Sequence, residues 1–440
     1  MTVISGGTSI RRIPVFLLSL VAVSVSLHAL PRERSPEDRI PETADVRTYM
    51  REEVLAPKQE VLERPREQVF RQNVSDTRVK YEVRAGDEHF YLLFLNEVPA
   101  SDRNDGYPVF GAGNYIVRRN MDDGSFSQIK VFLQTDPGFF ARLFPDGDRV
   151  RMEIHAAGER LYSNIALSTS FERLLFAPFS TVIEMTDSIV DWEYLLPEVD
   201  PARYEEVRTM AERARDALSS LPDAEDGAMD ENGKLVSIES LVLQDDQPGF
   251  NCSGFAKWIV DGIVEPRTGE YLGIDRLKQK HLDARGHRWS ARREEERDPY
   301  FGLDWSRNLA AALLELDRPG SDIDPEAADV RRVPYARYVE DVGYPVGELR
   351  RVLYGLALEE PGHFYIGSVN QEFGTEPVLR QHVHIAVFFP YFDESGRFRV
   401  TLLERNVEST LDSLADRYAG AYVHLVRARA DERFTPPAIE

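Results

Sequence analysis

Short runs of alternating apolar and polar residues dominate the chain between residues 78 and 197. Such runs include His89–Leu95, Gln128–Leu133 and Arg149–His155, and turn-forming segments such as Asp122-Asp123-Gly124 separate them. An apolar residue at every second position is typical of a strand with one buried face. The pattern predicts an antiparallel β-rich module over 78–197, with a sandwich- or barrel-like fold.

The segments on either side of this module have other patterns. Residues 30–77 are rich in Arg, Glu and Pro without a sustained apolar period, which predicts a charged tail that is partly helical or disordered. Between residues 198 and 234, apolar positions at helical spacing precede an acidic stretch that contains glycine. This second pattern predicts a helix followed by a linker between two domains.

The region 235–432 begins with a helical pattern and ends with strand patterns. Residues 253–264 are apolar with a helical period, and β-type runs occur between residues 364 and 426. A helix packed on a later antiparallel sheet is an α+β arrangement. We therefore expect an α+β chain in which the β-rich module precedes a second domain, 235–432, with a helical insertion at about 265–360.

The first 29 residues have the pattern of a secretory signal peptide. Arg11 and Arg12 precede an apolar run from Ile13 to Leu27, and a small residue, Ala29, ends the segment. A cationic start followed by a short apolar stretch is typical of an export signal. We expect an exported protein that is periplasmic, envelope-associated or secreted, and an uncleaved N-terminal anchor is the alternative.

The net charge and the single cysteine limit the classes of function that this chain can have. The chain has 53 Lys and Arg against 75 Asp and Glu, a net charge of −22, and it has no long basic stripe. Nucleic acid as the main partner is therefore not expected, because binding phosphates requires clustered cations. The single cysteine, Cys252, cannot form an internal disulfide. It is either a small buried apolar residue or a thiol with a chemical role.

The sequence around Cys252 favours a chemical role. Cys252 stands at the start of the predicted helix, directly after the turn-forming Gln247-Pro248-Gly249, and Asn251 is a suitable N-cap. A helix N-terminus lowers the pKa of a thiol, and its backbone N–H groups can stabilise an oxyanion. We therefore predict Cys252 as a nucleophile, with Asn251 and Ser253 as neighbouring substrate-binding residues.

A base for this nucleophile must come from elsewhere in the chain. His382 and His384 are two residues apart in a predicted strand and are expected to share one face of it, with His384 as the base and His382 as a substrate-binding residue. Glu404 and Asn406 alternate onto one face of the next strand, and either could orient the imidazole. The His-x-His pair could instead bind a metal, but it has no third ligand at a suitable spacing. We expect neither a metal nor a cofactor.

Three segments resemble the NlpC-type cell-wall cysteine peptidases, which are papain-like enzymes. The segment Pro248–Trp258 (PGFNCSGFAKW) is similar to their nucleophile motif, G-F-D-C-S-G-[LF]-x-x-[YWF]. The run from His384 (HIAVFF) is similar to their H-V-G-I-Y-I strand, which carries the base, and the run from Gly362 (GHFYIG) to the strand before it. The resemblance implies a papain-like fold and a Cys–His–polar triad. It also implies cleavage of peptidoglycan stem peptides at a D-glutamyl–diamino-acid bond.

The chain departs from that family at several points. Asn251 stands where Asp is usual, a Tyr-bearing segment upstream of the nucleophile has no counterpart, and the insertion at 265–360 separates nucleophile and base. Two alternatives therefore stay open. One is a papain-like protein with other acyl-transfer or amidase chemistry, or with none. The other is a non-enzymatic envelope-binding protein in which Cys252 belongs to the core.

Overall fold

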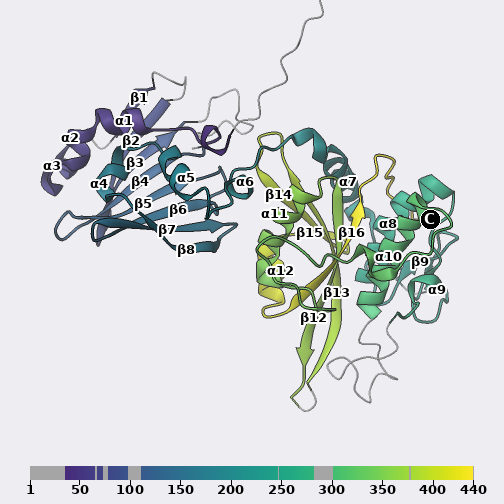
Figure 1. Ribbon diagram of the computed structural model, residues 1–440. Coiled ribbons are helices and arrows are strands. Elements are labelled where there is room, and N and C mark those ends of the chain that lie inside the picture. The colour runs from purple at the N-terminus through teal and green to yellow at the C-terminus, as the bar shows by residue number, and fades with distance from the viewer. Residues whose placement is uncertain are drawn as a thin grey trace, which may run out of the picture.

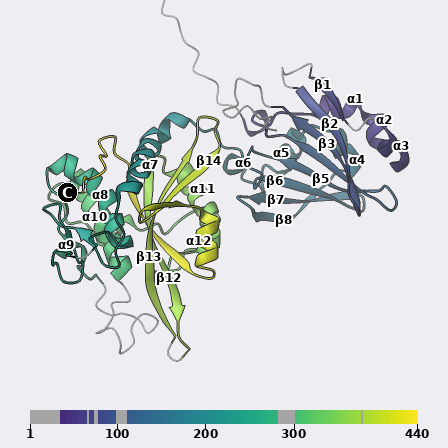
Figure 2. The same cartoon turned by 180° about the vertical axis from the view of Figure 1, so that it is seen from behind.

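The computed structural model describes residues 35–64, 67–72, 78–97, 111–245, 247–281, 301–375 and 378–439. Within these ranges the chain forms two units, each built on one antiparallel β-sheet with helices packed against it (Figures 1 and 2). The predicted α+β class is confirmed. The expected signal segment, residues 1–29, lies outside the described residues. None of the described helices is long and apolar enough to cross a membrane.

The N-terminal unit contains an eight-stranded sheet whose strands pair in their order along the chain. Alternating burial along most of its strands agrees with the pattern in the sequence. The first and last strands do not pair, so the sheet is open, and the expected sandwich or closed barrel is not formed by the described residues. The strands are β1 (Glu67–Arg71), β2 (Arg78–Ala85), β3 (His89–Asn96), β4 (Tyr115–Asn120), β5 (Phe126–Phe132), β6 (Phe140–Asp146), β7 (Arg149–Ala156) and β8 (Glu159–Leu167).

Residues 36–63 are part of this unit, so the prediction of a charged tail is wrong there. Val46, Met50 and Val54 are buried in the same apolar core as the strands. The fully buried Arg47 donates hydrogen bonds to the carbonyls of Leu175 (2.6 Å) and Ala177 (2.9 Å), which ties this segment to the end of the unit. The helices of the unit are α1 (Ala44–Tyr49), α2 (Arg51–Leu55), α3 (Lys58–Glu63), α4 (Phe171–Phe176), α5 (Ser180–Thr186) and α6 (Trp192–Leu195).

The C-terminal unit contains a six-stranded antiparallel sheet in the order β11-β16-β12-β13-β14-β15. Its central strands, β12 and β13, continue beyond their neighbours as a long hairpin (Figure 1). The strands are β11 (Tyr344–Pro345), β12 (His363–Phe373), β13 (Leu379–Phe392), β14 (Phe398–Glu404), β15 (Val407–Ser409) and β16 (Tyr422–Arg429), and a separate pair consists of β9 (Ala228–Met229) and β10 (Leu235–Val236).

Helices cover both faces of the second sheet. One face packs against α7, α8 and α10, and the other against α11 and α12 (Figures 1 and 2). α7 is the helix expected before the linker, and α10 falls in the expected insertion; both contribute to the core, in which Trp305 and Leu309 are fully buried. The helices are α7 (Glu205–Ala217), α8 (Cys252–Thr268), α9 (Ile274–Leu277), α10 (Phe301–Asp317), α11 (Leu349–Glu359) and α12 (Leu411–Arg417).

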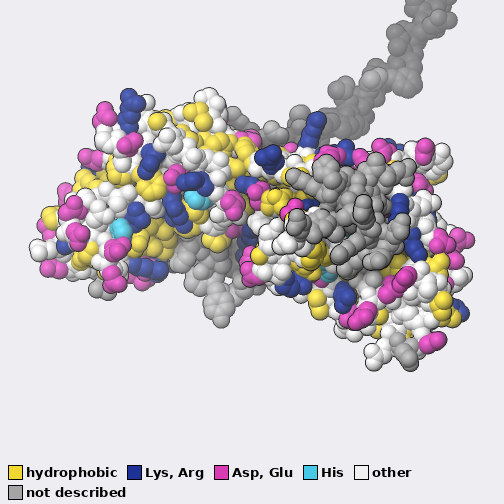
Figure 3. Space-filling view, turned by 90° about the horizontal axis from the view of Figure 1, so that it is seen from below, with side chains coloured by type: hydrophobic (Ala, Val, Ile, Leu, Met, Phe, Trp, Pro, Cys, Tyr) yellow, Lys and Arg dark blue, Asp and Glu magenta, His cyan; other side chains and the backbone are white. Residues whose placement is uncertain are grey.

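The two units share a continuous apolar core. Gln134, in the loop after β5, donates hydrogen bonds to the Leu195 carbonyl (2.7 Å) and to the Tyr354 hydroxyl on α11 (2.9 Å). Arg350 of α11 forms an ion pair with Asp136 of the same loop (2.6 Å). These contacts fix the N-terminal sheet against the face of the second unit that carries α11. Acidic and basic side chains are interspersed on the face shown in Figure 3.

Candidate functional site

Cys252 is the first residue of α8, as the sequence predicted. The side chain of Asn251 accepts a hydrogen bond from the Gly254 N–H (2.9 Å), which caps the helix, and the Asn251 N–H donates to the Gly227 carbonyl (3.1 Å). A Cβ atom at Gly254 would lie 1.9 Å from the Gly227 carbonyl oxygen, so only glycine permits this close approach. The helix start is thus held firmly, and the half-buried thiol projects from it.

The other end of α8 is held by the C-terminal segment of the chain. Pro266 lacks an N–H group, so the carbonyl of Gly262 loses its partner within the helix. The N–H of Thr435 occupies that carbonyl instead (2.9 Å). The Trp258 indole also donates to the Pro437 carbonyl (3.0 Å). These contacts stabilise the helix that carries the thiol.

The thiol of Cys252 lies close enough to the imidazole of His384 that each lowers or raises the pKa of the other through hydrogen bonding and charge, and the Ile385 N–H also acts on the thiol. Burial alone would raise the pKa of the thiol, but the hydrogen bond and the charge of His384 outweigh it and hold this pKa below its ordinary value. Burial would lower the pKa of His384, yet its bonds to Cys252 and Glu404 raise it to about 9. Near neutral pH this combination favours a thiolate beside an imidazolium.

Glu404, the last residue of β14, orients the imidazole. One carboxylate oxygen lies 2.7 Å from Nε2 of His384, and the Glu404 side chain is only 3% exposed. Burial would raise the pKa of Glu404, but hydrogen bonds from His384, Ser409 and Arg417 outweigh it and lower this pKa to about 2. Glu404 is therefore ionised at every pH at which the protein would be expected to work.

Two neighbours of the site carried no motif in the sequence. The ring of Tyr418 stacks on the His384 imidazole, with 5.6 Å between the ring centroids and 15° between the planes. Arg417 forms an ion pair with the second oxygen of Glu404. Both follow from the position of α12 against the sheet, which a local sequence pattern does not reveal.

The structure separates His382 from His384, so the prediction that they share a face is wrong. Their partners on β12 are Asn370 and Val369, which are consecutive residues and lie on opposite faces, and the register shifts between them. Val383 is the additional residue of this β-bulge. His384 therefore faces α12, whereas His382 packs against α10. Two histidines on opposite faces cannot bind one metal ion together.

The alternation expected for Glu404 and Asn406 is also wrong. β14 ends at Glu404, and the chain turns through Arg405 (φ +49°) so that Val407 pairs back with Glu404. Asn406 lies in this turn, and its amide is 3.5 Å from the Leu221 carbonyl. Glu404 alone of the two contacts the imidazole.

The predicted substrate-binding residues have mostly structural contacts. Asn251 is the cap of α8, and Ser253 is buried (5% exposed), with its carbonyl bonded to the Trp305 indole (2.9 Å). Among the first-turn N–H groups, that of Gly254 is bonded to the Asn251 side chain, whereas those of Cys252 and Ser253 have no acceptor within the helix. His382 lies against Gly302 on the α10 side of the sheet, away from the imidazole of His384.

A surface pocket of about 510 Å³ lies beside the segment that leads to Cys252, although neither Cys252 nor His384 lines it. Arg405 links the pocket to the thiol, because it lines the pocket and its charge lowers the pKa of Cys252. Arg405 is paired with Asp223 (2.8 Å), and Asp226 accepts hydrogen bonds from Ser237 and from backbone N–H groups. The pocket is lined by Asp223, Ala224, Glu225, Asp226, Gln244, Gln247 and Arg405.

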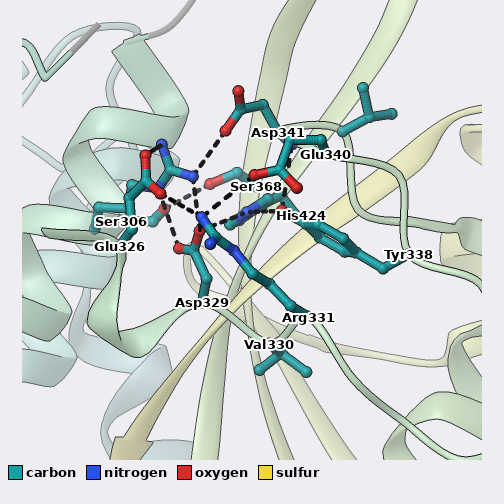
Figure 4. A network of polar contacts seen from close by, with 12 residues as sticks. Ser306, Glu326, Asp329, Val330, Arg331, Tyr338, Glu340, Asp341, Ser368 and His424 are labelled. Atoms are coloured by element: carbon teal, nitrogen blue, oxygen red, sulfur yellow. Dashed lines mark hydrogen bonds and ion pairs between the residues drawn. The ribbon is translucent and has the colours of Figure 1, made fainter.

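A second polar network lies inside the C-terminal unit (Figure 4). The fully buried Arg307 of α10 forms two hydrogen bonds with Asp329 (3.1 and 2.7 Å) and one with Asp341 (2.8 Å). His424 contacts Asp329 (3.5 Å) and the Tyr338 hydroxyl (3.1 Å). Because Arg307, Asp329 and His424 have no exposed side-chain surface, a substrate cannot reach them, and we assign this network to stability.

Comparisons with known proteins cover the N-terminal unit alone. A family model described as a domain of unknown function (DUF8515) matches residues 36–194. This range agrees with the first structural unit, including helices α1–α3. No curated protein and no solved structure matches the chain. Among the described residues, no group of three or more His, Cys, Asp or Glu side chains could hold a metal ion.

Proposed function

We propose that this chain is an exported cysteine hydrolase that cleaves peptide or amide bonds, with Cys252 as nucleophile, His384 as base and Glu404 as the group that orients His384. The substrate proposed is a peptidoglycan stem peptide, cut at a D-glutamyl–diamino-acid bond. Export is inferred from the pattern of residues 1–29. The substrate is inferred from the resemblance of the segments around Cys252 and His384 to the NlpC-type peptidases.

One observation carries this proposal. A thiol at the N-terminus of a helix lies beside an imidazole whose charge and hydrogen bonding lower the pKa of the thiol, and a buried carboxylate lies 2.7 Å from Nε2 of that imidazole. Acyl transfer by a thiol requires a nucleophile, a base beside it and a group that orients the base, and these three groups contact one another here in that order. A cysteine that merely fills space in a core needs no such partners, so the contacts count against the non-enzymatic alternative.

The chemistry follows from these contacts. The Cys252 thiolate attacks the carbonyl carbon, and the oxyanion that forms accepts hydrogen bonds from N–H groups at the start of α8. The imidazolium of His384 gives its proton to the leaving amine as the C–N bond breaks, which leaves a thioester on Cys252. His384 then takes a proton from water as that water attacks the thioester. The acid product departs, and the thiolate–imidazolium pair is restored.

The pocket that Arg405 lines is compatible with the proposed substrate. Three carboxylates line it, and Glu225 forms no ion pair among the described residues. A diamino acid carries a second amino group, which is a cation near neutral pH. Other amides with a nearby cation would satisfy the same pocket, so acyl-transfer or amidase chemistry on another substrate is the second candidate.

Digestion of purified sacculi by the full-length protein tests the proposal. Mass analysis of the released fragments should identify ends formed by cleavage between D-glutamate and the diamino acid. Cys252→Ser and His384→Ala should each abolish release, while circular dichroism shows that both variants are folded. Release of the same fragments by Cys252→Ser would refute the proposed nucleophile. An inactive wild type whose thiol is alkylated rapidly near pH 6, where an ordinary thiol is protonated, would favour the second candidate.

A further inference from the structure

Arg417 contacts the candidate site from the solvent side. Its guanidinium forms an ion pair with Oε1 of Glu404, while Oε2 of the same carboxylate contacts Nε2 of His384. The guanidinium also lies 3.5 Å from the Ser409 hydroxyl. Each oxygen of Glu404 therefore has a cationic partner, one being the imidazolium and the other the guanidinium. Arg417 itself is 46% exposed, whereas Glu404 is 3% exposed.

Helix α12 places Arg417 at this position. The Thr410 hydroxyl accepts a hydrogen bond from the Ser413 N–H (3.1 Å) and so caps the helix, and Leu414 is fully buried. Nε of Arg417 donates to the Ser413 carbonyl (3.3 Å), which directs the guanidinium toward β15. The next residue is Tyr418, whose ring stacks on His384. The end of α12 thus contacts both members of the His384–Glu404 pair.

We propose that Arg417 is a positioning residue that keeps Glu404 ionised and directed at His384 in acid, and so extends the thiolate–imidazolium pair to lower pH. This inference rests on the proposed function, because it concerns the same thiol. Arg417 does not touch the reacting atoms. It acts through Glu404.

The charged and titratable groups that face Glu404 determine the direction of the effect. They are His384, Arg417 and Tyr418, and behind these Cys252 acts on His384 and Arg405 acts on Tyr418. Burial would raise the pKa of Glu404, so the hydrogen bonds from its partners are what hold this pKa at about 2. His384 is the strongest of these partners and Arg417 is a weaker one, so the loss of Arg417 moves the pKa of Glu404 upward but leaves the contribution of His384 in place. A protonated Glu404 no longer stabilises the imidazolium, and the thiol then regains its proton at a higher pH.

Alkylation of the single cysteine tests this role without a substrate. The rate constant for iodoacetamide is measured against pH in the full-length protein, within the acid range in which circular dichroism shows each variant to be folded. The acid limb of this profile is the pH range in which the rate constant falls as the thiolate gains a proton. Arg417→Gln should move the acid limb upward by about one pH unit, so that alkylation within this range is about tenfold slower. Arg417→Lys should restore part of this shift, because it keeps the charge but loses the planar fork.

Arg399→Gln is the matched control. Arg399 is 48% exposed, lies on the same strand as Glu404 and is paired with Asp393 (3.0 Å) far from the thiol. Its acid limb should coincide with that of the wild type. If the wild-type thiol reacts in acid and Arg417→Gln has the same acid limb, the role of Arg417 is refuted but the proposed function is not. A wild-type thiol that reacts only near its ordinary pKa would overturn this role and the proposed function together.

Discussion

Replacing Glu404 by Gln should lower the free energy of unfolding by an amount that depends on pH. The substitution keeps the size of the side chain and an oxygen that can accept a hydrogen bond, but it removes the charge 2.7 Å from the His384 imidazole. The imidazolium then loses a buried counter-ion, so the pKa of His384 falls. The activity should fall as well, by roughly two to three powers of ten, because the base is less well oriented.

The magnitude follows from the pKa of His384, which is raised from 6.5 to about 9. That difference corresponds to about 3 kcal/mol of the free energy of unfolding. Because the folded pKa is the higher one, this stabilisation is fully present below about pH 6.5 and is lost as the pH rises through about 9. Cys252 and Glu404 share it, so the variant should lose about 1–2 kcal/mol more near pH 6 than near pH 10.

Urea unfolding followed by circular dichroism at about pH 6 and about pH 10 measures this difference. Glu404 is ionised at both values, since its pKa is about 2, and the lost contact with Arg417 cancels in the comparison. Glu408→Gln is the control, because Glu408 is 45% exposed and is paired with Arg215 (3.3 Å) away from the imidazole. An equal loss of unfolding free energy at the two pH values would refute the assigned charge coupling.

Three further substitutions test the packing around the site. His382→Ala should leave the alkylation rate of the thiol unchanged and lower the unfolding free energy by about 1–3 kcal/mol, because His382 lies on the α10 face. Gly254→Ala should destabilise the protein by about 1–3 kcal/mol in urea unfolding, since the new Cβ would lie 1.9 Å from the Gly227 oxygen; a gain in stability would contradict the contact. Asp329→Asn should cost about 3–5 kcal/mol in the same assay, because it leaves Arg307 without its main counter-ion.

The elements that could be predicted are those whose pattern is local. The strands of the N-terminal sheet alternate visibly, and those of the C-terminal sheet are short apolar runs that are buried on both faces. α8 has a cap at Asn251 and an apolar helical period. The segment 36–63 was predicted as a partly helical or disordered tail, and its packing into the core was missed although Val46, Met50 and Val54 recur at every fourth position, which is a helical signal. Its helices are short, and the many charges around them concealed this pattern. α10 was placed in an insertion, yet its buried Trp305 shows that it belongs to the core.

The residues of the candidate site also differ in whether a local sequence pattern reveals them. Cys252 and His384 were found because a helix start and a histidine-bearing strand can be read from neighbouring residues. The choice between Glu404 and Asn406 could not be made, because it depends on where β14 stops pairing. Arg417 and Tyr418 gave no signal at all. Their relation to His384 exists only after α12 has folded onto the sheet.

The irregular part of the sheet is also what makes the site possible. β14 pairs with β13 only as far as Val387, so Ile385 has no neighbour on that side. Its N–H is then able to bond to the sulfur of Cys252, which approaches from the α8 face. The bulge at Val383 turns His384 to the opposite face, where Tyr418 and Glu404 lie. The thiol and the imidazole therefore meet across the end of the sheet, each held by a different layer of helices. A deletion of Val383 would leave the pairs His384–Val369 and His382–Asn370 in register. It should therefore keep His384 directed at Glu404 and preserve the acid reactivity of the thiol, which alkylation would measure directly.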